Sequence, residues 1–498
     1  MSIRRSVSGP AFVLTAGRTL AFGASFFIPI VLVRVFSAAE FGTYKQVFIL
    51  YDTLYYIAQA GLATSLFYFV PRAPEYAARY VANAGIVIGG LAAVCAVVVA
   101  TRGEWVSWLF QNPRLESLLL PGAIYLLFLM MAAPLEIVMI CRQRYRLAAG
   151  SYALSDLLRA CALVLPTIAT GDLRWLLVGA LTFASVRCGA AVLYLGGVYG
   201  SSLRPNRPLL GEQLRYSLPF GLAVLVGTLQ ANFHHFVVSH TFDAATFAIF
   251  AVGCLQIPLI DFIATPMADV MMVKMTEARR GRSVAEAKAI WHQAASDLAL
   301  LFVPLVGLLV VAADELILFL FTESYAASVP IFRVYALTIL FAPLLVESVL
   351  RVHADTRFIL LLNTLQLVTV AALIGPLLAR FGLIGGVLVT LTAVSIVRTL
   401  GLTRVKRLVG GGVRDLLPWS RLVRIGAIAA IATAAALGVK TAITAPPVIA
   451  LGAIGITHLG VWAVLSWRWG FLPVPTSFSM RSWLRRYGGP SLGSQRAD

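Results

Sequence analysis

The chain has 498 residues, of which 59% are hydrophobic and 12% are charged, and its mean hydropathy is +0.86. Soluble domains carry about 25% charged residues, so this composition excludes an ordinary soluble domain and indicates a protein embedded in lipid. The formal net charge of +18 does not indicate nucleic-acid binding, because the cations lie in short links between apolar runs and not on one folded face.

Apolar runs of bilayer-spanning length follow one another along the whole chain. A helix needs about 20 apolar residues to cross the hydrocarbon core, and by this criterion we predict roughly fourteen spans. In chain order they lie at 10–33, 45–70, 80–100, 117–140, 148–170, 174–196, 215–239, 244–272, 293–313, 329–350, 357–379, 382–403, 424–442 and 446–467. The expected fold is therefore all-α: a polytopic membrane protein with about 14 transmembrane helices.

The cations in the links are distributed unequally between the two sides of the membrane. With the N-terminus placed in the cytoplasm, about 28 Lys and Arg residues fall on the cytoplasmic side and about 7 on the other. One span too many or too few would destroy this asymmetry, so we expect an even number of spans and two cytoplasmic termini. The segment 276–292 combines helical spacing with a cationic side, which predicts an amphipathic helix at the membrane surface.

A short motif occurs twice, 206 residues apart. The first copy is FSAAEFGTY at 36–44, the second is FDAATFAIF at 242–250, and each lies between two long apolar runs. With an even number of helices in each half, the duplication predicts two parallel-repeat six-helix bundles plus two extra C-terminal helices. The expected divisions are an N-lobe at 1–200, a C-lobe at 201–410, two further spans at 411–470 and a cytoplasmic tail at 471–498. If the lobes rock against each other, the two copies of the motif should meet at an outer gate.

Three stretches of sequence resemble a known family of transporters. RVFSAAEFGTY at 34–44, followed by AGLATSLFYFVPR at 60–72, resembles the opening of the Wzx-type lipid-linked oligosaccharide flippases, and QLRYSLPFGL at 213–222 is similar to the opening of their seventh span. These flippases belong to the multidrug/oligosaccharidyl-lipid/polysaccharide (MOP) exporter superfamily. The resemblance implies a protein that flips a polyprenyl-pyrophosphate-linked sugar unit across a bacterial inner membrane. Where members often carry an acid in the seventh span, this chain has Asn232, His234 and His235.

The resemblance also implies the partners and leaves one other transport function open. The expected partners are the lipid-linked oligosaccharide and membrane lipid, together with a polysaccharide polymerase and glycosyltransferases of the same pathway, and no nucleic acid. A membrane enzyme such as a glycosyltransferase would need a large extramembrane domain, and no link is long enough for one, so we predict no enzymatic activity and no cofactor. A cation-coupled antiporter for drugs or small solutes, which shares the superfamily plan, remains the alternative.

Cations inside apolar spans are costly and are therefore candidates for substrate binding. Arg18 lies in the first span and Arg187 near the middle of the sixth. Either could hold the pyrophosphate with its planar guanidinium group, and Arg18 could instead reach back to the cytoplasmic interface. Arg159, deep in the fifth span, is a third candidate, although Asp156 one turn earlier predicts a structural ion pair.

Acidic and aromatic residues within the spans complete the candidate site. Asp52 and Asp261 are candidates for proton or cation coupling, with a structural hydrogen bond or ion pair as the alternative. Tyr51 and Tyr55, one turn apart, could contact the sugar or form part of an interfacial aromatic belt.

Histidines in the seventh span could in principle bind a metal ion. His234 and His235 are neighbours, but no further ligand follows at metal-binding spacing, so the sequence predicts no metal site. An interfacial position is the simplest interpretation of this pair.

Overall fold

The computed structural model describes residues 23, 25–281, 283–410 and 412–471, and in these residues every regular element is a helix. Eleven of the described helical segments are long and apolar enough to cross a membrane. Two further expected spans are interrupted helices, α2–α3 and α11–α12, and the described part of the first is the apolar helix Ser25–Val35. An all-α polytopic membrane fold is confirmed. The number fourteen depends on counting these three as crossings.

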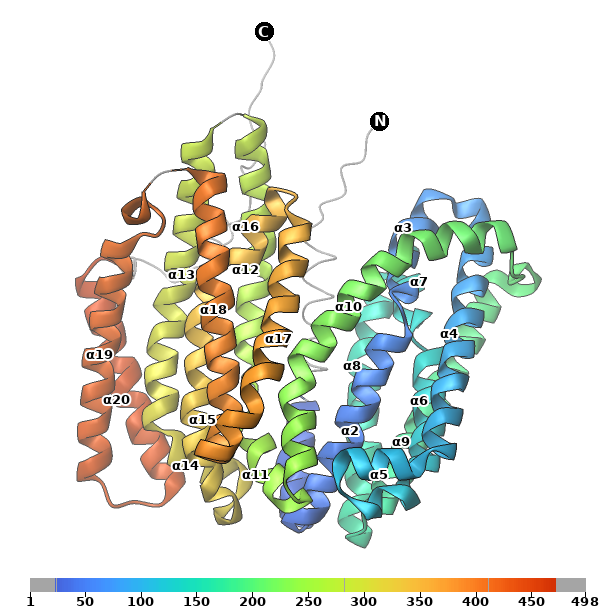
Figure 1. Ribbon diagram of the computed structural model, residues 1–498, viewed down its shortest axis with the longest axis horizontal. Coiled ribbons are helices and arrows are strands. Elements are labelled where there is room, and N and C mark those ends of the chain that lie inside the picture. The colour runs from blue at the N-terminus through green and yellow to red at the C-terminus, as the bar shows by residue number, and fades with distance from the viewer. Residues whose placement is uncertain (1–22, 24, 282, 411, 472–498) are drawn as a thin grey trace.

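The first half of the chain forms a bundle of helices that run back and forth between two ends (Figure 1). Its elements are α2 (Ala38–Ala58), α3 (Leu62–Arg72), η1 (Pro74–Tyr76), α4 (Ala77–Thr101), α5 (Gly103–Phe110), η2 (Pro113–Leu115), α6 (Glu116–Met131), α7 (Pro134–Cys141), α8 (Tyr145–Thr170), α9 (Leu173–Tyr199) and η3 (Gly200–Ser202).

The second half repeats this order of elements. It contains α10 (Arg207–Thr241), α11 (Ala244–Gly253), α12 (Pro258–Arg280), α13 (Val284–Val311), α14 (Ala313–Phe321), η4 (Glu323–Ser328), α15 (Val329–Ala336), η5 (Leu337–Leu344), α16 (Val346–Val352), α17 (Thr356–Phe381), α18 (Leu383–Val409) and η6 (Val413–Asp415). The helices that begin at Ala38, Gly103 and Leu173 thus have counterparts that begin at Ala244, Ala313 and Leu383, 206 to 210 residues later. The predicted duplication is confirmed.

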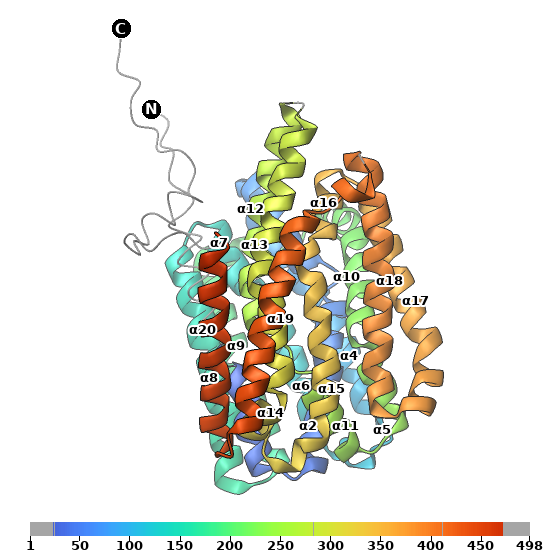
Figure 2. The same cartoon turned by 90° about the vertical axis from the view of Figure 1, so that its left-hand side faces the viewer.

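Two more helices, α19 (Trp419–Ala442) and α20 (Pro447–Arg468), complete the described chain. They pack on each other and on α13 and α14, on the outside of the second bundle (Figure 2). Lys440 Nζ lies 3.0 Å from Glu315 Oε2 and also bonds to Asp314, so partly buried ion pairs connect α19 to α14.

The second expected span begins at a capping box and is interrupted at Ala60 and Gly61. Ser37 caps α2, because its side chain accepts a hydrogen bond from the Glu40 backbone N–H while the Glu40 carboxylate bonds back to the Ser37 N–H. The helix ends where Ala60 and Gly61 adopt left-handed backbone angles, with φ of 46° and 71°, which continue no right-handed helix. The expected single span at 45–70 is therefore two helices.

The segment 276–292 is not the separate surface helix that its amphipathic pattern predicts. Residues up to Arg280 continue α12, and residues from Val284 begin α13, so the segment is the tip of a helical hairpin. Ser283 explains the restart, because its side chain accepts a hydrogen bond from the Glu286 N–H and caps the new helix.

Helix α10 connects the two bundles. Its first part packs on α3 and α4, where Tyr216 stacks on Tyr68 with ring centroids 4.7 Å apart and Gln213 donates to Ser65 Oγ at 2.9 Å. Its later part packs on α17 and α18 of the second bundle. In Figure 1 this helix crosses from one bundle to the other. A long helix shared in this way is suited to transmit movement of one bundle to the other.

Topology can be tested at both ends of the bundle. One end, here called the cation-rich end, carries the links between α3 and α4, α7 and α8, α9 and α10, α12 and α13, and α18 and α19. Cations lie in these links or on the helix turns next to them, among them Arg72, Arg142, Arg204, Arg280 and Arg407. We expect this end to face the cytoplasm. Reporter fusions after Lys288 and Trp467 should therefore report cytoplasmic locations, and a fusion after Gly171, at the opposite end, a periplasmic one. A periplasmic signal after Lys288 would overturn the assignment.

Candidate functional site

At the end opposite the cation-rich end, the two bundles are sealed together by backbone contact. Helix α2 packs along α11, so the two copies of the repeated motif lie against each other as expected for a gate. Gly42 permits close approach of the two backbones, since a Cβ atom built there would lie 1.7 Å from the carbonyl oxygen of Ala244. We call this contact between α2 and α11 the seam.

Buried polar side chains join the bundles beside the seam. Gln46 Nε2, from α2, donates to Ser239 Oγ of α10 at 2.8 Å. Asn112 Nδ2 donates to Gln46 Oε1 at 2.6 Å and to Thr43 Oγ1 at 2.9 Å. All four residues are buried, and hydrogen bonds between neutral side chains can be exchanged for water when the helices separate. The seam therefore resembles a reversible contact more than a permanent core.

Two further contacts close the same end. Phe41 of α2 meets Tyr325 of η4 edge to face, with centroids 5.8 Å apart. Arg34, from the first described helix, donates to the backbone carbonyls of Leu320 at 2.8 Å and Phe319 at 2.6 Å, both in α14.

Toward the cation-rich end the bundles separate. Helix α12 packs on α13 and α16, and extensive packing of α12 or α16 on α2, α3 or α7 is absent among the described residues. Among the described helices, α10 is the one that bridges the bundles near this end, through the contacts of Tyr216 and Gln213 described above. The conformation is thus sealed at one end and diverges toward the other (Figure 1).

A group of ionisable side chains lies inside the first bundle, about half-way along its helices. We call it the charged cluster, and its members are Lys45, Asp52, Glu136, Asp156, Arg159 and Arg187. They come from α2, α7, α8 and α9. The cluster contains three basic and three acidic side chains, so their charges can cancel. The members differ in whether they have an ion-pair partner.

Arg187 is paired. Its Nη2 atom lies 2.8 Å from Glu136 Oε2, its Nη1 donates to Ser155 Oγ, and Ser151 Oγ donates to the other Glu136 oxygen at 2.8 Å. The Glu136 side chain is only 3% exposed. The spacing of acids along the sixth span could not reveal this partner, because Glu136 belongs to α7 and reaches Arg187 across a helix interface.

Arg159 is not paired. Its Nε atom is buried, and no hydrogen-bond or ion-pair partner lies within reach in the described part of the chain. The predicted ion pair with Asp156 is therefore wrong: Asp156 and Asp52 are near enough for their charges to act on Arg159, but neither lies within ion-pair distance. A guanidinium group with five donors and no fixed acceptor is able to bind an anion.

Asp52 is the exposed acid of the cluster. It lies on the side of α2 that also carries Tyr56, which is 54% exposed, and its nearest charged neighbours are Arg159 and Lys45. An anion bound to Arg159 would therefore compete with Asp52 for the positive charges of Arg159 and Lys45.

The two tyrosines expected at the site lie in different environments. Tyr51 is 1% exposed, donates to the Leu119 carbonyl at 3.2 Å and packs on Gly122, so it forms part of the core between α2 and α6 and contacts no sugar in this conformation. Tyr55 is half-buried beside Tyr56 and near Arg187. Tyr51 is therefore corrected to a packing residue.

Two expected site residues cannot be placed. Arg18 lies outside the described residues, and so does the side chain of Asp261, although its backbone belongs to α12.

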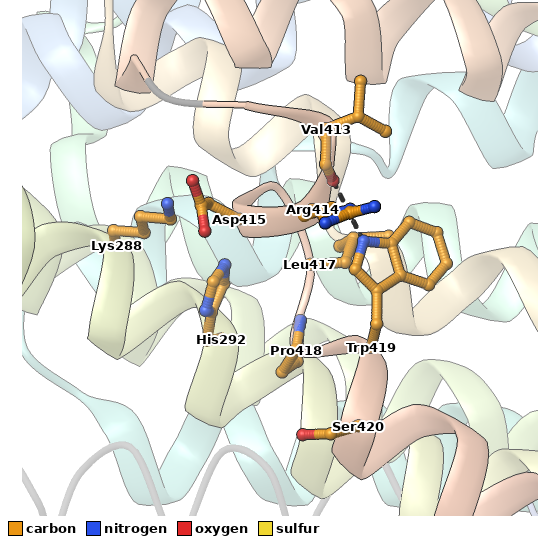
Figure 3. Close-up of a pocket in the computed structure, with 9 residues that line it drawn as sticks. All are labelled: Lys288, His292, Val413, Arg414, Asp415, Leu417, Pro418, Trp419 and Ser420. Carbon is orange, nitrogen blue, oxygen red and sulfur yellow. Dashed lines mark hydrogen bonds between the residues drawn. The ribbon is translucent and has the colours of Figure 1, made fainter.

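A surface pocket of about 750 Å³ lies at the cation-rich end, between α13 and the link from α18 to α19 (Figure 3). Trp419 Nε1 donates to the Val413 carbonyl at 3.0 Å, and a ring nitrogen of His292 lies 3.0 Å from the Leu416 carbonyl. The lining residues all come from α13, the link and the start of α19, so the pocket is separate from the seam and from the charged cluster.

A comparison with known protein families shows to which family this chain belongs. A family described as "Polysaccharide biosynthesis protein" matches residues 31–330, which is more than half of the sequence. The chain belongs to this family. The predicted resemblance to polysaccharide exporters is thereby confirmed. Among curated proteins, none shows significant sequence similarity to this member of the family.

Solved structures show which fold this polysaccharide biosynthesis protein shares. A lipid II flippase, MurJ, in an inward closed conformation superposes with a TM-score of 0.71 at 14% identity, covering 91% of this chain and 98% of that one. An inward-facing multidrug resistance MATE family transporter gives a TM-score of 0.56 at 16% identity over 82% and 97% of the two chains. A MOP superfamily transporter from Pyrococcus furiosus gives 0.53 at 14% identity over 81% and 96%. The protein thus has the fold of MOP superfamily transporters.

Proposed function

We propose that this protein flips a polyprenyl-pyrophosphate-linked oligosaccharide, a repeat unit of a surface or exopolysaccharide, across the bacterial inner membrane. Transport proceeds by alternating access between an N-lobe at 1–200 and a C-lobe at 201–410, with both termini in the cytoplasm. The observation that carries the proposal is the unpaired Arg159 in the middle of the first bundle, in a member of a polysaccharide biosynthesis family. An intramembrane cation without a partner is costly unless it serves a ligand.

Asp52 gives this binding site a means of release. Because Asp52 and a pyrophosphate would compete for Arg159 and Lys45, protonation of Asp52 favours the bound anion and deprotonation favours its departure. Arg187 is held by Glu136 and contributes a fixed dipole beside Tyr55. The lipid tail stays in the bilayer while the headgroup passes between the lobes, from the cation-rich end toward the seam.

The test is a flipping assay with the purified protein in liposomes and a fluorescent polyprenyl-pyrophosphate oligosaccharide. Replacing Arg159 by Ala should slow transfer about 10- to 100-fold, the equivalent of one charge-assisted hydrogen bond, and Arg159→Lys should restore part of it. Arg174→Ala removes the same charge from an exposed position on α9 and should have no effect. Unchanged transfer by Arg159→Ala would contradict the proposal, and export of lipophilic cations without lipid transfer would favour a drug antiporter.

A further inference from the structure

Two histidines and a cysteine meet in the interior of the second bundle, next to the seam. His234 and His235 lie in α10, and Cys254 follows directly after α11. Ligand atoms of all three residues lie within 4.8 Å of one another. His234 is 6% exposed, Cys254 is 5% exposed and His235 is half-buried, so two of the three side chains are shielded from bulk water. The sequence alone predicted no metal site because Cys254 lies about 20 residues further along the chain, beyond the end of the next helix.

Both histidines have a buried ring nitrogen that no described side chain or backbone group satisfies. His234 Nε2 and His235 Nδ1 are both buried and have no hydrogen-bond partner among the described residues. Leaving a buried polar nitrogen without a partner costs about 1–3 kcal/mol, so two together are unusual in a packed interior. A cation bound between them and the sulfur atom would satisfy both nitrogens.

The surroundings position the three side chains. The His235 ring lies edge to face against Phe250 with centroids 5.5 Å apart, and His234 meets the same ring at 6.0 Å. Gly253 fixes the chain next to Cys254, because a Cβ atom there would lie 2.5 Å from Ile331 Cγ2. Aromatic rings that exclude water and a backbone held by packing are the supports that metal ligands need.

We infer that His234, His235 and Cys254 form a binding site for one borderline-soft transition-metal ion, such as Zn²⁺. Two imidazoles and a thiolate select such an ion over Mg²⁺ or Ca²⁺, which prefer oxygen ligands. In a tetrahedral zinc site, ligand atoms lie about 3.3–3.6 Å apart, a distance that small side-chain rotations reach from the present arrangement. Binding replaces the Cys254 thiol proton, which leaves to solvent, and three protein ligands leave the fourth position open.

The location gives the ion a structural consequence. It would join α10, the helix shared by both bundles, to the end of α11, the helix of the second bundle that forms the seam. Lys45 lies close enough to His235 for their charges to interact, so its ammonium group disfavours the metal ion. Removal of that charge by Lys45→Met should tighten metal binding.

Cobalt is the appropriate probe, because tetrahedral Co²⁺ absorbs visible light strongly and a cobalt–thiolate bond adds a charge-transfer band. The full chain, purified with a tag that lacks histidine and stripped of metal, should bind one equivalent of Co²⁺ with both features, and Zn²⁺ should displace it. Cys254→Ser should remove the charge-transfer band and weaken Zn²⁺ binding roughly 100-fold or more, since even loss of an outer-shell partner costs 10- to 100-fold. Cys161→Ser, at an exposed position on α8, is the matched control and should change neither.

A second measurement distinguishes the loss of metal binding from misfolding of a variant. Zn²⁺ should raise the melting temperature of the wild-type protein and of Cys161→Ser, but not of Cys254→Ser or His234→Gln. A weak octahedral cobalt spectrum in the wild type, or equal cobalt binding by wild type and Cys254→Ser, would overturn the inference. These measurements involve no transport, so their outcome is independent of the proposed flippase activity.

Discussion

Replacing Gly42 by alanine should open the seam and abolish transport. The added Cβ atom would lie 1.7 Å from the Ala244 carbonyl oxygen and 2.5 Å from its carbon, and both are backbone atoms that no side-chain rotation can move aside. Overpacking of this kind costs about 1–3 kcal/mol, which disfavours the sealed state roughly 5- to 150-fold relative to a state with this end open. A transporter that cannot seal one end cannot complete an alternating cycle.

The state of the seam can be measured through Ser239, which is fully buried there. In a background without other reactive cysteines, Ser239→Cys should resist a membrane-impermeant maleimide when residue 42 is glycine and react quickly when it is alanine. Gly89→Ala on α4 is the matched control, because nothing lies within 4 Å of its added Cβ atom. Equal labelling with glycine and alanine at residue 42 would show that the seam does not depend on this contact.

The second large effect concerns the stability of the first bundle. Arg187→Ala should destabilise the protein by about 3–5 kcal/mol, because it leaves the Glu136 carboxylate buried without its cation. Glu136→Ala should cost a similar amount by leaving Arg187 alone. Replacing both by methionine should recover most of the loss, since a buried ion pair is often no more stabilising than apolar residues of similar volume.

Thermal unfolding in detergent measures these differences in stability. It also distinguishes the role of Arg187 in stability from the role of Arg159 in transport. Arg159→Ala should melt close to the wild type, because Arg159 has no partner to leave behind, while its flipping rate falls. If Arg187→Ala melted like the wild type, the ion pair would not support the fold. If the double methionine variant were stable but inactive, Arg187 would also act on the substrate.

Periodicity and composition were sufficient to predict the architecture, and contacts between helices explain what they could not predict. The duplication was visible at Phe36 and Phe242, because each repeat must bury the same apolar faces. The partner of Arg187 was not visible, because pairing rules along one helix cannot reach Glu136 on another. For the same reason the sequence did not show that Cys254 lies next to His235.

The interruption of the second span shows a different limit of sequence analysis. Ala60 has no intrinsic preference for a positive φ, and its conformation follows from the packing of Gly221 of α10 against it, where a Cβ atom would lie 2.5 Å from the Ala60 carbonyl oxygen. The prediction that Tyr51 lies at the binding site failed for a related reason. One face of α2 packs on α6 and the other carries Asp52, and hydrophobicity alone does not distinguish them.

The central claim is that the two lobes alternate about the seam between α2 and α11, and a reversible crosslink tests it most directly. Gln46 and Ser239 are in side-chain contact across the lobes, with Gln46 Nε2 and Ser239 Oγ 2.8 Å apart. Cysteines at these two positions, in a chain whose five native cysteines have been replaced, should be joined readily by a short cleavable thiol crosslinker. We expect the crosslinked protein to remain sealed at this end and to stop flipping lipid, with activity returning on cleavage. Complete crosslinking with unchanged transport would contradict the account.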